Sequence, residues 1–156
     1  MGCEVVAFSG STLKEAEVLS IGATACYTSE SLRSAAFGRG LNILIVTTPI
    51  MPDWSVYTPL LASKATIFPL TIGPGLLSLP SMPLLLNGIT IQGSVVSPRN
   101  VHERMLEFAA RHSIKPIVQT FAMSREGIQQ AFATLEEGNM RYRGVLVVPE
   151  KERLAE

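Results

Sequence analysis

A turn of small and basic residues, from Ser9 to Lys14, holds the groups best suited to chemistry in this chain. Ser9 and Ser11 offer hydroxyl donors, Gly10 lets a ligand approach the backbone, and Lys14 adds a positive charge. No carboxylate stands where a nucleotide-binding turn places one to accept from a ribose 2′-hydroxyl. This combination suits a ribose 2′-phosphate and so favours NADP. The same residues also fit an ordinary strand-to-helix turn, with Ser11 or Thr12 as the helix cap and Lys14 solvated.

A strand and a helix must position this turn. Val5 to Phe8 form a short apolar run of the kind found in a fully buried strand. From Thr12 the apolar period becomes helical and continues to about Leu19, where Gly22 ends the helix. A strand that turns directly into a helix is half of a βαβ unit. In open α/β sheets, ligands bind at such turns, at the carboxyl ends of the strands.

The rest of the chain repeats the alternation of strands and helices. Further strands are predicted at Ala23–Tyr27, Leu41–Thr47, Ala65–Ile72, Ile89–Val96, Lys115–Phe121 and Arg143–Val148. Helices are predicted over Ser29–Phe37, after an N-cap at Asp53, after an N-cap at Asn100, and from Ser124 to Gly138. Pro69 indicates irregular pairing in its strand, and the Leu/Pro-rich segment before Leu86 is a loop or a broken helical turn. The pattern predicts an α/β fold with a doubly wound parallel sheet and right-handed crossovers.

Composition narrows the functional classes. The 156 residues carry 13 Lys plus Arg and 13 Asp plus Glu, so no net charge attracts nucleic acid or anionic lipid. Cys3 and Cys26 are expected to be reduced core residues, and no signal peptide or membrane span is expected, which indicates a cytoplasmic protein. A mean hydropathy of +0.30 is high for such a chain. Buried parallel strands, or a surface covered by further chain or a partner, would account for it.

Four motifs stand in a specific order along the chain. They are Met1 to Ser11 with Lys14, Ile21-Gly22-Ala23, Gly93-Ser94 after Ile89-Thr90-Ile91, and Gly138 followed by Arg143-Gly144-Val145. With these motifs, the chain from Met1 to about Glu150 resembles the carboxyl-terminal part of medium-chain, zinc-type alcohol dehydrogenases. The resemblance is to the NADP-dependent cinnamyl alcohol dehydrogenase branch.

The resemblance implies cofactor-binding roles for twelve residues. It places Ser9, Gly10, Ser11 and Lys14 at the adenosine ribose and its 2′-phosphate, and Arg143 at the pyrophosphate. It places Thr47 and Thr48 beside the nicotinamide ribose, Ile72 and Gly73 along the nicotinamide face, and Ser94, Val95 and Val96 near the carboxamide. It implies no catalytic residue and no metal ligand in this chain.

The departures from the family pattern matter as much as the matches. A first strand with a Gly-rich turn precedes these residues in the family, and the zinc ligands also lie upstream. His102 and His112 stand without partners at zinc-ligand spacing and are interpreted as surface residues. The family pattern also pairs the Ile89–Val96 edge strand across a homodimer, which is therefore expected here.

The combined prediction is a Rossmann-type domain that lacks the first strand and Gly-rich turn. Residues 1–113 would form this partial NAD(P)-binding domain, residues 114–150 a strand-helix-strand segment of the catalytic domain, and residues 151–156 a tail. The expected function is the cofactor-binding part of an NADP(H)-dependent alcohol dehydrogenase or aldehyde reductase, not catalytic as an isolated chain. Two alternatives remain: a non-catalytic remnant that dimerises or binds nucleotide, and a fragment of an enzyme with a normal amino-terminal half.

Overall fold

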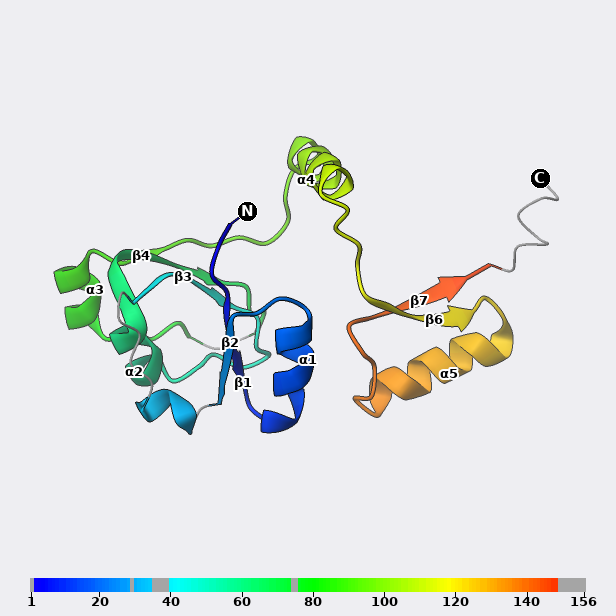
Figure 1. The fold of residues 1–156 in the computed structure, drawn as a ribbon, viewed down its shortest axis with the longest axis horizontal. Coiled ribbons are helices and arrows are strands. Elements are labelled where there is room, and N and C mark those ends of the chain that lie inside the picture. Colours follow the sequence, from blue (N-terminus) through cyan, green and yellow to red (C-terminus); the bar gives the residue numbers. More distant parts are fainter. Residues whose placement is uncertain (1, 29, 35–39, 74–75, 149–156) are drawn as a thin grey trace. The chain divides into compact units, whose positions relative to one another are not determined.

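The chain divides into two compact units in the computed structural model, which describes residues 2–28, 30–34, 40–73 and 76–148 (Figure 1). The first unit is Met1–Val96 and the second is Ser97–Glu156. The expected tail at 151–156 and parts of the expected helix Ser29–Phe37 lie outside the described residues.

Five strands of the first unit form two parallel sheets. Strand β1 (Val6–Ser9) pairs with β2 (Ala25–Thr28), and the second sheet has the order β3 (Leu41–Val46), β4 (Leu61–Pro69) and β5 (Thr90–Ile91). Among the described residues, β1 and β3 are not paired with each other. The α/β class and the parallel strands are confirmed. The described strands of this unit are divided into two sheets between β1 and β3.

Short helices connect these strands. After β1 come a 3-10 turn, η1 (Thr12–Lys14), and α1 (Glu15–Ser20); η2 (Ser31–Ser34) follows β2. Asp53 caps α2 (Trp54–Tyr57), which runs into η3 (Thr58–Leu60), as expected of a helix shortened by proline. The Leu/Pro-rich segment forms a regular helix, α3 (Ser81–Asn87), which ends at the left-handed Gly88.

The core of the first unit lies on one face of the three-stranded sheet. Ile67 is 0% exposed, and the buried residues around it include Leu44 and Val46 of β3 and Trp54 of α2. Helices α2 and α3 supply the covering side chains on this face. Ile43 and Ile45, which alternate with the buried residues of β3, are 57% and 58% exposed. The central strand, expected to be buried on both faces, is covered on one.

The strand predicted at Ile89–Val96 is wrong in length, because β5 contains only Thr90 and Ile91. The Gln92 N–H donates to the Ile67 carbonyl at 2.9 Å, and the next bond of a parallel ladder would require an N–H from residue 69. That residue is Pro69, which has no N–H, so the ladder ends there.

Toward β3, the irregular pairing of β4 occurs before Pro69, whereas at Pro69 only the ladder to β5 is interrupted. Pro69 itself is in register with Val46, since its nitrogen points away from β3. The register shifts between Leu41 and Ile43, where β4 contains Lys64 with a φ of 61°. Gly40 is required beside this irregularity, because a Cβ there would lie 2.7 Å from the Ala62 nitrogen.

The second unit is a helix followed by a strand-helix-strand segment. It comprises α4 (Arg99–Arg111), β6 (Val118–Ala122), α5 (Arg125–Glu136) and β7 (Arg143–Val147), with β6 and β7 parallel. Ser124 caps α5 by accepting from the Gly127 N–H, as expected. Asn100 is not the cap of α4, because the helix begins at Arg99 and Pro98, with an extended ψ of 160°, takes the cap position.

Candidate functional site

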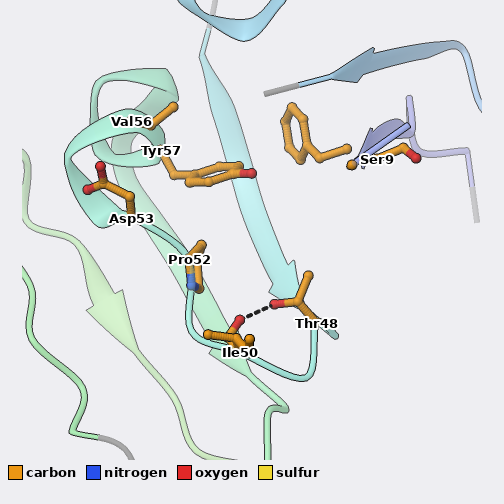
Figure 2. A pocket seen from close by; sticks show the side chains of 9 residues that line it. Ser9, Thr48, Ile50, Pro52, Asp53, Val56 and Tyr57 are labelled. Atoms are coloured by element: carbon orange, nitrogen blue, oxygen red, sulfur yellow. Dashed lines mark hydrogen bonds between the residues drawn. The ribbon is translucent and has the colours of Figure 1, made fainter. Parts of the chain in front are cut away.

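A cavity of about 400 Å³ lies in the first unit, at the carboxyl ends of β1 and β3 (Figure 2). This is the position where open α/β sheets bind ligands, and the volume lies in the range of small-molecule pockets. The residues that line it are Phe8, Ser9, Gly10, Thr48, Ile50, Pro52, Asp53, Val56 and Tyr57.

The turn after β1 forms one wall of the cavity. The Ser9 hydroxyl donates to the Ser11 carbonyl at 2.9 Å, and its oxygen accepts from the Ser11 N–H at 3.2 Å. The Ser11 hydroxyl oxygen caps η1 by accepting from the Leu13 N–H at 3.2 Å. The Ser9 proton is therefore used within the turn, whereas the Ser11 hydroxyl can still donate to a ligand. A Cβ built on Gly10 would meet nothing within 4 Å, so the space beside this backbone is open.

The segment after β3 forms the opposite wall. The Thr48 hydroxyl donates to the Ile50 carbonyl at 2.7 Å (Figure 2), and the Thr48 carbonyl accepts from the Thr71 hydroxyl at 2.7 Å. The first bond lies within the loop, and the second holds the loop against the segment that follows β4. The Asp53 carboxylate accepts from the Ser55 N–H at 3.0 Å and the Ser55 hydroxyl at 2.7 Å, which orients it as the cap of α2.

The lining is mainly apolar and aromatic. The rings of Phe8 and Tyr57 meet edge to face, with their centroids 5.5 Å apart. Ile50, Pro52 and Val56 add aliphatic surface, and Asp53 is the one charged residue among those that line the cavity. Such a lining suits a flat, neutral ring better than a phosphate group, which the Asp53 carboxylate would repel.

The structure brings three of the twelve predicted cofactor-binding residues to the cavity: Ser9, Gly10 and Thr48. The other nine do not line it. Ser11 and Lys14 follow in the same turn and Thr47 directly precedes Thr48, whereas Ile72, Gly73, Ser94, Val95 and Val96 lie in segments without regular structure. Arg143 begins β7 in the second unit.

Sequence reasoning missed most of the apolar wall. Asp53 was predicted only as a helix cap, and Ile50, Pro52 and Val56 were assigned no role. One signal was available, because these residues follow the carboxyl end of the most apolar strand, where ligands bind in such sheets.

Other expectations concerned cysteines, histidines and membranes. Cys3 is exposed, contrary to the prediction of a core position, and Cys26 is half-buried in β2; neither forms a disulfide. His102 and His112 are exposed, and no cluster of three or more His, Cys, Asp or Glu among the described residues could hold a metal ion. None of the helices described is long and apolar enough to cross a bilayer.

Parallel strands, intervening helices and a cavity at the carboxyl ends of two of the strands define an α/β protein of the Rossmann type. Comparison with protein families is more specific. Residues 1–111 match the family model described as "Zinc-binding dehydrogenase", and the chain therefore belongs to this family.

Two curated relatives and one solved structure extend this result. The chain is 35% identical over 146 residues to the aldehyde reductase AdhA of Synechocystis sp., covering 93% of this chain and 43% of the relative. It is 25% identical over 147 residues to the NADP-dependent alcohol dehydrogenase C 1 of Mycolicibacterium smegmatis, covering 94% and 42%. A cinnamyl alcohol dehydrogenase from Sorghum bicolor superimposes with a TM-score of 0.80 and 25% identity, over 93% of this chain and 41% of that one. The chain thus spans about two fifths of the length of these proteins.

Proposed function

We propose that this chain is the cofactor-binding part of an NADP(H)-dependent alcohol dehydrogenase or aldehyde reductase. The observation that carries the proposal is the Ser9–Lys14 turn, which opens onto a cavity at the carboxyl ends of β1 and β3. The family membership and the activities in the names of the relatives support the same reaction class.

The cavity and the turn would bind different parts of the nucleotide. The apolar wall of Ile50, Pro52 and Val56 would hold the adenine ring, and the open backbone at Gly10 would allow the ribose to approach. The 2′-phosphate would lie outside the cavity, away from Asp53. There the Ser11 hydroxyl can donate to it, and Lys14, which is exposed and forms no ion pair among the described residues, supplies the charge.

The remaining predicted residues keep their proposed roles around the nicotinamide end. These are Thr47 and Thr48 at its ribose, Ile72 and Gly73 at its face, and Ser94, Val95 and Val96 at the carboxamide. Bound NADPH would supply a hydride to an aldehyde, and NADP⁺ would accept one from an alcohol.

The described residues do not fit the zinc ion of the family, because they contain no suitable ligand cluster. We therefore assign no reaction step that involves zinc to this chain, and we propose that the isolated chain binds cofactor without turnover. Cys3 and Cys26, as free thiols, suit a reducing compartment such as the cytoplasm.

A comparison of two cofactors tests the proposal. Titration with NADPH, followed by its fluorescence, should show tighter binding than titration with NADH. Lys14→Ala should weaken NADPH about tenfold, or about 1.4 kcal/mol, and leave NADH nearly unchanged. Lys115→Ala, which removes an exposed lysine of the second unit, is the matched control. Equal weakening of both cofactors would contradict a role for Lys14 at the 2′-phosphate.

A dimerising remnant is the second candidate function, and the outer edge of β5 favours it. The Gln92 N–H faces β4, so the backbone of Ile91 points away from the sheet. Two such edges could pair across a homodimer, although only a short stretch of strand is available. Sedimentation of the chain without nucleotide tests this candidate, and a monomer at micromolar concentration would exclude it.

A further inference from the structure

Three residues that line the cavity carry a hydroxyl group, and they differ in how the protein uses its proton. These residues are Ser9, Thr48 and Tyr57. The Ser9 hydroxyl donates to the Ser11 carbonyl, and the Thr48 hydroxyl donates to the Ile50 carbonyl. The Tyr57 hydroxyl forms no hydrogen bond with any residue that the structure describes. Of the three, Tyr57 is therefore the one whose proton is left for a ligand.

The hydroxyl oxygen of Tyr57 is accessible. Among the described residues, Trp54 Nε1 is the one buried side-chain nitrogen or oxygen that has no hydrogen-bond partner. An unbonded Tyr57 oxygen enclosed in the core would be a second such atom, so this oxygen must be open to the cavity or to solvent. Figure 2 shows the Tyr57 side chain extending away from α2, with the hydroxyl group at its far end.

The ring that carries this hydroxyl is held in place by the protein. Tyr57 is half-buried and packs against the core cluster of the first unit. Its ring meets the Phe8 ring edge to face, with the centroids 5.5 Å apart and an angle of 80° between the planes. A side chain that is already positioned loses little conformational entropy when a ligand binds to it.

An adenine base in this cavity needs a hydrogen-bond donor. Its ring nitrogens are acceptors, and an acceptor that leaves water for an apolar lining without a new partner costs binding free energy. An ionised Asp53 carboxylate only accepts hydrogen bonds and cannot provide this partner.

We propose that the Tyr57 hydroxyl donates a hydrogen bond to a ring nitrogen of the adenine base. This inference rests on the proposed function, because it requires that the cavity binds the adenine end of the cofactor. Tyr57 is then a cofactor-binding residue, and it selects a base that presents an acceptor at this edge.

Removal of the single oxygen atom tests the proposal. Tyr57→Phe keeps the ring and its contact with Phe8, and it should raise the Kd for NADPH about 3- to 12-fold in a fluorescence titration. The free energy of unfolding in urea should not change, because the hydroxyl has no hydrogen-bond partner among the described residues. Tyr142→Phe is the matched control, since it removes the same atom from an exposed tyrosine of the second unit and should leave the Kd unchanged.

A fragment of the cofactor locates the contact. Adenosine 2′,5′-bisphosphate contains the adenine base and the 2′-phosphate but no nicotinamide. Isothermal titration calorimetry should show that Tyr57→Phe weakens the binding of this fragment by the same factor as that of NADPH.

Three results would overturn the assignment of Tyr57 and leave the proposed function standing. They are an unchanged Kd for NADPH in Tyr57→Phe, a loss of affinity for NADPH but not for the bisphosphate, and a lower free energy of unfolding that accompanies the weaker binding. The second would move the contact to the nicotinamide half, and the third would give the hydroxyl a structural role. If the wild-type chain bound neither ligand, the proposed function would be wrong, and the role of Tyr57 with it.

Discussion

Replacing Gly10 by alanine should leave the fold intact and weaken nucleotide binding. The added Cβ would meet nothing within 4 Å, and Gly10 is not among the glycines with a positive φ. The free energy of unfolding should therefore stay constant or rise by about 0.4–1 kcal/mol, because alanine restricts the unfolded chain. In the complex, the methyl group would occupy space that the ribose needs.

The size of the binding defect follows from the contact that would be lost. A ligand oxygen that accepts from a backbone N–H lies about 2.9 Å from the nitrogen. A ligand atom needs ~3.5–4.0 Å of separation from a carbon atom, so the new Cβ would push a ligand held this close away from the backbone. Loss of one hydrogen bond between the ribose and this backbone costs about 0.5–1.5 kcal/mol, which corresponds to about 2- to 12-fold in Kd. Fluorescence titration with NADPH measures Kd, and urea unfolding measures stability.

Lys115→Ala serves as the control for this experiment as well. This exposed lysine lies in the second unit and does not line the cavity. The Kd of this variant for NADPH should stay within about twofold of wild type. If Gly10→Ala bound NADPH as tightly as wild type while remaining folded, the nucleotide would not approach this backbone, and the proposed binding mode would be wrong.

Three further predictions concern stability. Ile67→Ala should lower the free energy of unfolding by about 2–5 kcal/mol, since this side chain is 0% exposed. Ile45→Ala should lower it by less than about 1 kcal/mol, because Ile45 is 58% exposed. Equal losses for the two variants in urea unfolding would contradict a core on one face of the sheet. Ser124→Ala should cost about 0.5–2 kcal/mol by removing the cap of α5, and an unchanged melting temperature would argue against that cap. Gly127→Ala should cost about 1–3 kcal/mol, because its Cβ would collide with the Ala122 carbonyl, and a variant as stable as wild type would show that β6 and α5 are packed less closely.

Local features of the fold were predictable from the sequence, because neighbouring residues determine them. The Ser9–Lys14 turn, the Asp53 cap and the Ser124 cap each depend on a hydroxyl or carboxylate within three residues of the N–H that it accepts from. The helix ends at Gly22 and Gly138 were predictable for the same reason, because a glycine with a positive φ ends each helix on its own.

Features that depend on distant residues were not predictable in the same way. The short β5 results from Pro69, which is remote in sequence, and the division of the sheet results from strand order rather than from any strand's own pattern. The aromatic part of the cavity lining combines Phe8 of β1 with Tyr57 of α2, and no local pattern in the sequence connects these two residues. The resemblance predicted the turn at the cavity but not this pair of rings.

Pro69 also affects the segment that follows β5. Because the ladder stops at Gln92, the peptide groups of Gly93 to Val96 form no hydrogen bonds among the described residues. Each remains available to an incoming amide, such as the carboxamide of a nicotinamide ring. A residue with an N–H at position 69 could donate to the Gln92 carbonyl and add one bond to the ladder between β4 and β5. The proline therefore leaves the segment after β5 without that bond.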